Sequence, residues 1–360
     1  MSSVWGHRIT VSVFGESHGA AIGVVIDSLP AGKRIDLDKV LIQMARRAPG
    51  LSKSSTTRLE KDIPRVISGL LDGVTTGAPV CAVIENTNAH SKDYGNLGAV
   101  MRPSHSDYPA FVKYGGYNDI RGGGHFSGRL TAPLVFAGAV CRQFLEDEGI
   151  MIGGHVARVG KISDEIFDMN HISRGMLEQL SETTFATISP GAALAMQAEI
   201  EKARLEQDSV GGIVECAAIG LPVGIGSNIF STVESRLSSL LFAIPAVKGV
   251  EFGLGFGFST ENASAVNDAY EMDGDAVSLK TNYNGGILGG MTDGAPLVVR
   301  AAFKPTPSIS KAQDSVNLLK KKNEILTING RHDPCIVGRA LPVVESAVAI
   351  GLLDLILEAK

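Results

Sequence analysis

The sequence predicts a single α+β domain spanning residues 1–360, with sheets packed against helices. Three observations lead to this class. Hydrophobic residues make up 44% of the chain, enough for a substantial core. Strand-like and helix-like segments do not alternate regularly, as they would in a doubly wound fold. The chain has 42 glycines, a number typical of many positive-φ turns and of close approaches between backbone and ligand.

Five segments carry apolar residues at helical spacing. In the first, Asp36 is a candidate N-cap, and Gly149 ends the second. Pro342 is expected near the first turn of the last helix, where proline is tolerated. The expected helices are 36–47, 130–148, 191–207, 232–242 and 342–359.

Six short apolar or β-branched segments, bounded by Gly, Pro and Asn, are expected to be strands. They are 9–14, 23–28, 80–85, 212–218, 250–256 and 296–302.

The sequence also contains an internal echo. G-L-L-D-G-V-T-T-G-A-P-V at 69–80 matches G-I-L-G-G-M-T-D-G-A-P-L at 286–297 in seven of twelve positions. L-P-A-G at 29–32 matches L-P-V-G at 221–224, and the order is the same in both halves. We interpret this as an internal pseudo-duplication, with pseudo-repeats of about 1–150 and 205–340. Two glycine-rich turns that are alike by chance are the alternative.

Composition excludes several classes of protein. The formal net charge of −5 is unfavourable for a nucleic-acid-binding face. The four cysteines are widely spaced and form no C-x-x-C pair, so neither a zinc site nor a redox pair is expected, and no other metal-ligand spacing is present. The N-terminus lacks the order of a signal peptide, and no run of 18 apolar residues exists. A soluble cytoplasmic protein with no membrane or nucleic-acid partner is expected.

No G-x-G-x-x-G opens a helix after a strand, and no P-loop motif is present. Polar residues gather instead in glycine- or proline-flanked loops. Histidines in such loops are candidate acids or bases, because imidazole titrates near neutrality; a surface position is the common alternative. The five loops are 15–19, 102–108, 121–129, 304–308 and 331–334.

Two of these loops suit an anion. Three consecutive glycines at 122–124 expose backbone N–H groups just before a helix, which favours an anion over a merely flexible turn. Lys304, Thr306 and Ser308 offer a cation and two hydroxyls, as a phosphate site or an ordinary strand-exit loop would.

Basic residues are concentrated in or near the loops. Guanidinium groups match carboxylate and phosphate oxygens, so a polyanionic ligand is expected, with structural salt bridges as the alternative for any single arginine. These basic residues are Arg46, Arg47, Lys53, Arg58, Arg102, Arg121, Arg129, Lys304, Arg331 and Arg339.

Taken in order, the loops resemble the chorismate synthase family over nearly the whole chain. The resemblance comes from G-E-S-H-G at 15–19, Arg46-Arg47 before P-G, R-P-x-H-x-D-Y at 102–108, R-G-G-G at 121–124, G-G-I-L-G-G at 285–290, K-P-T at 304–306 and R-H-D-P-C at 331–335. It implies a β-α-β sandwich, a homotetramer and a requirement for reduced FMN. The implied reaction is anti-1,4-elimination of phosphate from 5-enolpyruvylshikimate 3-phosphate, without net redox change, giving chorismate, the last common step of the shikimate pathway that leads to aromatic amino acids.

The resemblance also assigns roles. His18 is similar to the histidine beside the leaving phosphate, His105 to the one that serves the flavin ring, and Asp333 to the carboxylate that helps remove the C6 proton. Substrate-binding positions are Arg46, Arg47, Arg58 and Arg129. Flavin-binding positions are Gly124, His125, Phe126, Ser127, Ala246, Gly289, Lys304, Pro305, Thr306, Pro307, Ser308 and Arg331.

The chain departs from common family patterns at several of these positions. Many members read R-G-G-G-R-S-S-A-R-E where this chain has His125 and Phe126 in place of arginine and serine. Pro245, Lys53 and Pro307 stand where asparagine, arginine and serine are frequent.

The chain is also too short for the reductase region of bifunctional fungal members. A separate flavin reductase is therefore expected to supply reduced FMN, and the resemblance associates NADP with the activity.

Two other functions were weighed against this interpretation. A non-catalytic protein that binds flavin or a phosphorylated metabolite would not need His18, His105 and Asp333 together. A phosphate-releasing hydrolase is a further alternative. G-E-S-H-G places Ser17 at the centre of a G-x-S-x-G pattern, but little else of a serine hydrolase is present.

Overall fold

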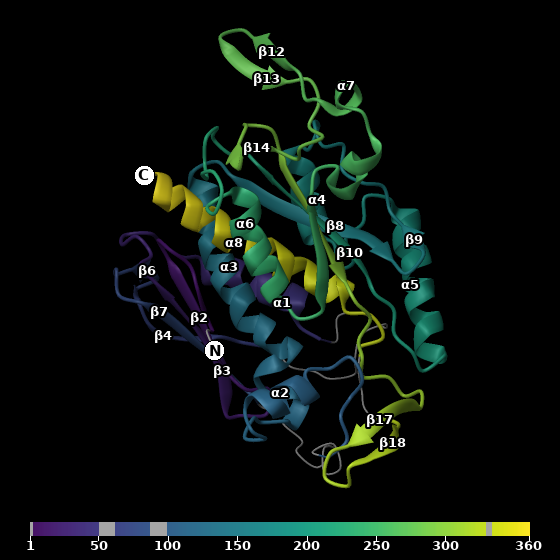
Figure 1. Ribbon diagram of the computed structural model, residues 1–360. Helices are drawn as coiled ribbons and strands as arrows, with labels where there is room; N and C mark the ends of the chain where they lie inside the picture. The colour runs from purple at the N-terminus through teal and green to yellow at the C-terminus, as the bar shows by residue number, and fades with distance from the viewer. Residues whose placement is uncertain (1–2, 50–61, 87–98, 329–332) are drawn as a thin grey trace.

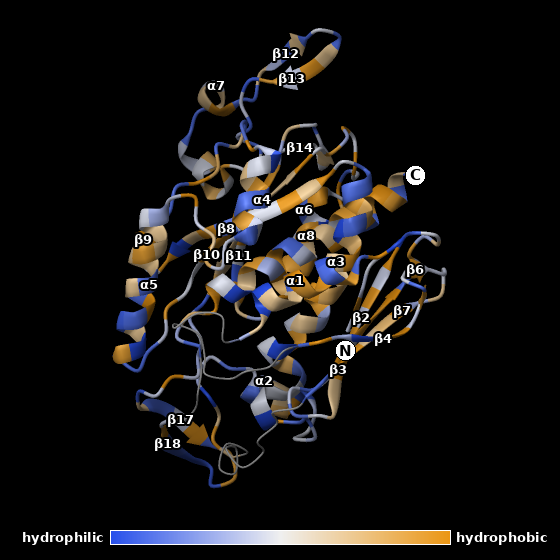
Figure 2. Cartoon of the chain, turned by 180° about the vertical axis from the view of Figure 1, so that it is seen from behind, coloured by the Kyte–Doolittle hydropathy of each residue, from blue (hydrophilic) through white to orange (hydrophobic). Residues whose placement is uncertain are grey.

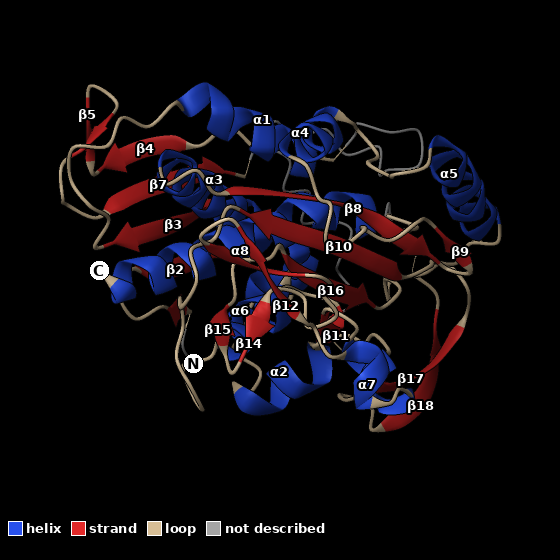
Figure 3. Ribbon diagram, turned by 90° about the horizontal axis from the view of Figure 1, so that it is seen from above, coloured by secondary structure: helices blue, strands red, loops and turns tan. Residues whose placement is uncertain are grey.

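The computed structural model describes residues 3–49, 62–86, 99–328 and 333–360. Two five-stranded antiparallel sheets enclose a layer of helices (Figures 1 and 3). The first sheet has the order β1 (Val4–Trp5), β2 (Thr10–Gly15), β3 (Ala21–Asp27), β7 (Val80–Glu85) and β4 (Arg65–Ser68). The second has the order β11 (Val247–Phe252), β16 (Leu297–Phe303), β10 (Gly212–Ile219), β8 (Met151–Val159) and β9 (Ile162–Ser163).

Two long helices cross between the sheets. α3 (Thr131–Asp147) packs on the first sheet and α8 (Val337–Ala359) on the second, with α1 (Leu37–Arg47) and α6 (Val233–Ala243) beside them. Apolar residues gather in this helical layer (Figure 2). The arrangement confirms the α+β class and the β-α-β sandwich.

α8 is long and apolar enough to cross a membrane, but 94% of its most apolar window is buried inside the protein. It is the core helix of this fold. Its contact with α3 is close, because a Cβ on Gly138 would lie 2.4 Å from Ser346 Cα.

The two halves of the molecule repeat the same plan. The order β2-β3-β7-β4 in the first sheet corresponds to β8-β10-β16-β11 in the second, and α1 corresponds to α6. Each half also carries a short hairpin, and these are β5 (Leu70–Leu71) with β6 (Val74–Thr75), and β14 (Ile287–Leu288) with β15 (Met291–Thr292). The hairpins are the segments that carry the sequence echo.

One buried threonine in each hairpin makes the same hydrogen bonds. Thr75 Oγ1 donates to the carbonyl of Pro30 at 2.8 Å, and Thr292 Oγ1 donates to that of Pro222 at 2.6 Å. Each hydroxyl also accepts a backbone N–H, from Lys33 at 3.0 Å and from residue 225 at 2.9 Å. The internal echo therefore corresponds to one turn structure built twice.

The predicted elements match the structure well, with two corrections. The Asp36 side chain caps α1 by accepting from the N–H of Asp38 and Lys39. α8 begins at Val337, so Pro342 lies inside the helix and not in its first turn. The strand expected at 250–256 ends at Phe252, because Gly253 and Gly255 have positive φ and the chain turns there.

Several elements lie outside the predicted set. They include strands β1, β4, β8 and β9, the hairpins β5–β6 and β14–β15, and helices α2 (Asp107–Lys113), α4 (Arg174–Glu182) and α7 (Ala263–Val266). Two more hairpins, β12 (Tyr270–Asp273) with β13 (Ala276–Leu279) and β17 (Gln313–Asn317) with β18 (Lys322–Leu326), were not predicted either. The helix expected at 191–207 is α5 (Pro190–Leu205).

Candidate active site

A cavity of about 920 Å³ lies among the loops that the sequence singled out. Its walls come from segments distributed over the chain, which are 3–5, 11–13, 47–49, 102–106, 122–134, 240–248, 303–308 and 333–343. The volume is at the upper end of the range for pockets that hold one drug-sized ligand.

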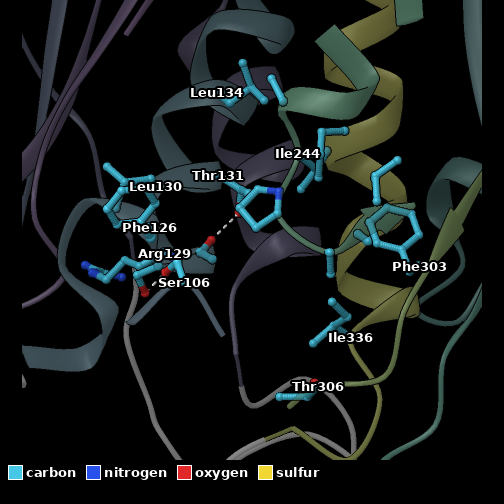
Figure 4. Close-up of a pocket in the computed structure, with 18 of the residues that line it drawn as sticks. Ser106, Phe126, Arg129, Leu130, Thr131, Leu134, Ile244, Phe303, Thr306 and Ile336 are labelled. Carbon is cyan, nitrogen blue, oxygen red and sulfur yellow. Dashed lines mark hydrogen bonds between the residues drawn. The ribbon is translucent and has the colours of Figure 1, made fainter. Parts of the chain in front are cut away.

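The cavity wall has an apolar part and a cationic part. Figure 4 shows Leu134, Ile244, Phe303 and Ile336 around the apolar part, with Thr306 at the lower end and Arg129 at the opposite side. The cationic side chains on the wall are Arg47, Arg102, Arg129, Lys248, Lys304 and Arg339. A ligand that is both aromatic and polyanionic matches such a wall.

The glycine loop brings two of the predicted histidines together. A Cβ on Gly122 would lie 2.2 Å from the His18 ring, and a Cβ on Gly123 would lie 3.4 Å from the His105 ring. Both glycines have positive φ, so side chains are excluded by conformation as well as by space. His105 lines the cavity, whereas His18 is buried behind Gly122 and is not part of the wall.

His105 is held by a buried acid. Its Nδ1 lies 2.6 Å from Asp107 Oδ1, and Arg102 forms a bidentate pair with the same carboxylate at 2.7 and 2.8 Å. Burial raises the pKa of Asp107, but the hydrogen bonds from His105 and Arg102 outweigh burial and hold it well below its usual range. Asp107 is therefore an anion at neutral pH.

Two buried arginines share a second carboxylate. Asp62 Oδ2 lies 2.7 Å from Arg47 Nη1, and its Oδ1 lies 2.6 Å from Arg129 Nη1. The three side chains are at most 6% exposed. Burial, with the nearby charges of Arg339 and Arg129, lowers the pKa of Arg47 to about 10 in spite of Asp62. A buried guanidinium with two other guanidinium groups near it is the kind of group to which an anionic ligand binds.

Asp333 also lies on the cavity wall and pairs with Arg339 Nη1. Arg339 Nε donates to the backbone carbonyl of Arg47 at 3.0 Å, so this guanidinium links the Asp333 loop to the end of α1. Of the three predicted catalytic residues, His105 and Asp333 thus line one cavity, and His18 lies directly behind its glycine loop.

The segment after β16 forms another part of the wall. Lys304, Thr306, Pro307 and Ser308 line the cavity, together with Ala246, whose φ is 75°. Pro305 is exposed and is not part of the wall. Lys304 Nζ donates to the carbonyl of Ser104, which ties this segment to the His105 loop. Burial and the charge of Lys248 lower the pKa of Lys304.

The 124–127 stretch is divided between structural and cavity-facing roles. Phe126 and Ser127 line the cavity, but Gly124 does not, and a Cβ there would lie 2.0 Å from the Asp119 carbonyl oxygen. His125 lines the cavity too, yet its Nδ1 lies 2.8 Å from the Gly15 carbonyl and its Nε2 lies 2.9 Å from Ser3 Oγ. Both ring nitrogens of His125 are thus occupied by the protein itself.

Besides His18, Gly124 and Pro305, two further predicted site residues do not line the cavity. Arg46 points into the helical layer and forms a bidentate pair with Glu345 of α8. Gly289 lies at the tip of the β14–β15 hairpin and does not line the cavity. Arg58 and Arg331 lie outside the described residues.

Sequence reasoning assigned no role to Asp62, Asp107 or Arg339. A signal for Asp107 was present, since it belongs to the R-P-x-H-x-D-Y motif. Arg339 was counted among the basic residues without a role, and Asp62 carries no local signal because its partners come from α1 and from residue 129. Among the described residues, no group of three or more His, Cys, Asp or Glu side chains could hold a metal ion.

Comparisons with known proteins agree with this geometry. The sequence model of the chorismate synthase family matches residues 9–357. A chorismate synthase of Dehalococcoides mccartyi strain BAV1 is 45% identical over 100% of this chain and 98% of its own length. One from Thermococcus kodakarensis is 44% identical over 99% and 98%. A crystal structure of chorismate synthase superposes with a TM-score of 0.76 at 26% identity, covering 99% of this chain and 93% of the other. The chain therefore belongs to the chorismate synthase family and is a carbon–oxygen lyase.

Proposed function

We propose that the protein eliminates phosphate from 5-enolpyruvylshikimate 3-phosphate to give chorismate, and that reduced FMN is required although no net redox change occurs. The observation that carries the proposal is the shared wall: His105, Asp333, Arg47 and Arg129 all face one cavity that also has a large apolar part. Such a wall suits a flavin ring and a polyanionic substrate side by side.

The residues present fit a flavin phosphate ester. The apolar side chains around Ile244, Phe303 and Ile336 match a flat aromatic ring system (Figure 4). Thr306 Oγ1 is buried and has no hydrogen-bond partner among the described residues. Because an unpaired buried hydroxyl costs about 1–3 kcal/mol, this group is suited to a polar ligand atom. We infer that Thr306, Ser308 and Lys304 contribute to the flavin site, with Arg331 and Gly289 as further predicted contacts.

The arginine cluster fits the substrate. Arg47 and Arg129 place two guanidinium groups on Asp62, which leaves one positive charge in excess, and the nearby Arg339 is paired with Asp333. Charge-assisted hydrogen bonds to carboxylate and phosphate are stronger than neutral ones. We infer that Arg47 and Arg129 bind the substrate's anionic groups, and that Arg58 remains a predicted member of the set.

Three titratable side chains, His105, Asp333 and His18, are proposed to have different roles in the reaction. When bound, reduced FMN supplies electron density to the substrate as phosphate leaves and regains it afterwards. His105 directs one ring edge at the glycine loop and keeps a proton on Nδ1 against Asp107, so the ring can donate or accept at Nε2. Asp333, held by Arg339, is proposed to help remove the C6 proton, and His18 to lend positive charge near the leaving phosphate.

Other parts of the proposal follow from the family. A homotetramer, a cytoplasmic location, and a separate flavin reductase, with NADP as an associated cofactor, are proposed on that ground. In a tetramer, Gly289 is proposed to serve the flavin site of a neighbouring subunit, since it does not line the cavity of its own chain.

The test is an anaerobic assay with purified protein, substrate and dithionite-reduced FMN, followed by chorismate absorbance. Asp333→Ala and His18→Ala are expected to lower turnover by about 10²–10⁴-fold while FMN still binds, as is typical of acid–base groups. Near-wild-type rates would remove the assigned roles. Flavin binding without product would favour a binding protein, and phosphate release without flavin would favour a hydrolase.

A further inference from the structure

We propose that Asp107 is a positioning residue for His105: its carboxylate fixes the proton on Nδ1 and turns the opposite edge of the ring toward the glycine loop, while Arg102 holds the carboxylate in place. The proposal rests on the proposed role of His105 in serving the flavin. It goes beyond that role by naming the group that sets the histidine's tautomer and orientation.

The contacts of Asp107 are complete. Oδ1 accepts from His105 Nδ1 at 2.6 Å and from Arg102 Nη2 at 2.8 Å. Oδ2 accepts from Arg102 Nε at 2.7 Å and from the Arg102 backbone N–H at 3.1 Å. Four donors fill the acceptor capacity of an ionised carboxylate. Because the acid accepts only, the ring nitrogen that faces it must be the protonated one.

The surrounding loop limits movement of the ring. Arg102 and Asp107 are 7% and 8% exposed, so the pair lies in a region that water does not screen. The His105 N–H donates to the Arg102 carbonyl at 3.2 Å, closing a turn through Ser104, whose φ is 55°. Lys304 donates to the carbonyl of Ser104, so the middle of the turn is held as well.

The opposite edge of the His105 ring, with Cε1 and Nε2, is the edge that can act on a ligand. Cε1 and Nε2 both lie 3.4 Å from where a Cβ on Gly123 would be, and His105 is on the cavity wall. With Nδ1 protonated against Asp107, Nε2 is the nitrogen that takes up and releases a proton. A ring turned by 180° about Cβ–Cγ would put the carbon Cδ2 against the Asp107 carboxylate, and Nε2 and Cε1 would exchange places at the glycine loop.

An amide at this position cannot reproduce the contacts. In Asp107→Asn, the NH₂ group takes the place of either Oδ1, where it faces His105 Nδ1 and Arg102 Nη2, or Oδ2, where it faces Arg102 Nε and the Arg102 backbone N–H. The first orientation is favoured because it keeps two of the three Arg102 hydrogen bonds, whereas the second keeps one. The NH₂ then faces His105, and the neutral imidazole must move its proton to Nε2.

The direct test needs neither flavin nor substrate. Two-bond ¹H–¹⁵N spectra of ¹⁵N-histidine-labelled protein report the tautomer of each ring, with His105 assigned through a His105→Gln sample. We expect wild-type His105 to carry its proton on Nδ1 and Asp107→Asn to move it to Nε2. A wild-type ring protonated only on Nε2, or unchanged signals in Asp107→Asn, would overturn the proposal. The wild-type measurement stands even if the variant does not fold.

Turnover gives the second measurement. Asp107→Asn is expected to lower kcat by about 10–100-fold with the substrate KM within threefold, because loss of a supporting partner acts on the group it orients. Asp107→Glu, which keeps the charge, should restore part of the rate. Glu201→Gln, which breaks an equally bidentate but exposed pair with Arg204, is the matched control and should change neither tautomer nor rate. A shifted tautomer with unchanged kcat would leave Asp107 as the positioning residue and overturn the proposed role of His105.

Discussion

Arg46 and Arg47 are neighbours on α1, yet their guanidinium groups lie in different surroundings. Successive residues on a helix point about 100° apart, so only one of the two can face the cavity. Arg47 reaches Asp62 and Thr131, whereas Arg46 reaches Glu345 of α8. The partner of each arginine thus decides its part: Arg46 joins two helices, and Arg47 lines the cavity.

Removing the countercharge of the cluster tests this assignment. In Asp62→Asn, two buried guanidinium groups lose their shared anion, and we expect a loss of about 3 kcal/mol in the free energy of unfolding. Added inorganic phosphate should recover part of this loss, because it can replace the missing charge. Urea denaturation with and without phosphate measures both effects.

The control for that experiment is Asp208→Asn, whose pair with Lys311 is exposed. Exposed pairs contribute about 0–1 kcal/mol, so little change is expected. Equal stabilisation of wild type and Asp62→Asn by phosphate would mean that the anion binds elsewhere.

A second buried group predicts how stability depends on pH. His155 is fully buried, with Nδ1 3.0 Å from Asp164 and Nε2 2.9 Å from Glu215. Burial lowers the pKa of His155, but the hydrogen bonds to the two acids outweigh it, and the net pKa is raised above the ordinary value of about 6.5. The folded protein therefore binds this proton more tightly than the unfolded chain does.

The sign follows from linkage. The contribution of His155 to stability is fully present below about pH 6.5 and is lost as the pH rises through the folded pKa, with a slope of at most about 1.4 kcal/mol per pH unit. The gap in unfolding free energy between wild type and His155→Gln should accordingly narrow above pH 6.5. Denaturation series from pH 5 to 9 measure the gap, with the exposed His171→Gln as control. A gap that is constant or widens over that range contradicts the prediction.

Between elements, the contact of α3 with α8 depends on the absence of a side chain. A Cβ on Gly138 would lie 2.2 Å from Ser346 Cβ and 2.4 Å from its Cα, so the helices must separate to admit it. Both helices are almost entirely buried between the sheets.

We expect Gly138→Ala to destabilise the protein by about 1–3 kcal/mol, the usual cost of overpacking a core. Gly175→Ala on α4 is the matched control, since no atom lies within 4 Å of its added Cβ and alanine is the better helix former. The control should be neutral or stabilising by up to about 1 kcal/mol. Thermal unfolding of both variants is the measurement. Equal melting temperatures of Gly138→Ala and Gly175→Ala would show that the helices are not tightly packed at Gly138.

How well each element could be predicted depended on the range of the interactions behind it. α1 was predicted closely because its cap, Asp36, and its apolar spacing are local signals. The start of α8 was misplaced because Pro342 is a local stop signal, and the helix continues through it only because it is buried among other elements. β8 was missed because two glycines at 153 and 154 hide a strand that its neighbours β10 and β9 define.

At the scale of the whole molecule, the two halves make the same turn with the same buried threonine. Thr75 and Thr292 are 3% and 2% exposed, and each hydroxyl both donates to and accepts from backbone of the preceding loop. The interpretation as one domain with two pseudo-repeats stays a prediction. Because the two threonines make the same hydrogen bonds, it can be tested by comparing the effect of their replacement on stability.

Thr75→Val and Thr292→Val should each destabilise the protein by about 1–3 kcal/mol, because each removes two hydrogen bonds of a buried hydroxyl, worth about 0.5–1.5 kcal/mol each. The two sites lie in different sheets, so the double variant should show the sum of the single effects. Chemical denaturation of the three variants is the measurement. Strongly unequal losses of unfolding free energy would show that the two turns contribute differently to the stability of the fold.

Like the helices and strands, the site residues could be predicted where the signal is local in the sequence. His105, Asp333, Arg47 and Arg129 were found because each belongs to a motif that can be read locally. The second partner of each group was not, since Asp62 meets Arg129 from 67 positions away in the chain. Arg46 and Gly289 also belong to motifs that can be recognised in the sequence. Only the fold shows that Arg46 pairs with Glu345 and that neither residue lines the cavity.

The walls of the cavity come from residues near both ends of the chain and from several segments between them. Residues 3–5 close one side and residues 333–343 another, so no isolated fragment possesses the complete pocket. During refolding, ligand recognition should accordingly emerge only after residues 3–5 and 333–343 have both reached their native places, later than helical content. A bound-flavin signal would then report completed assembly of the chain, which circular dichroism alone does not.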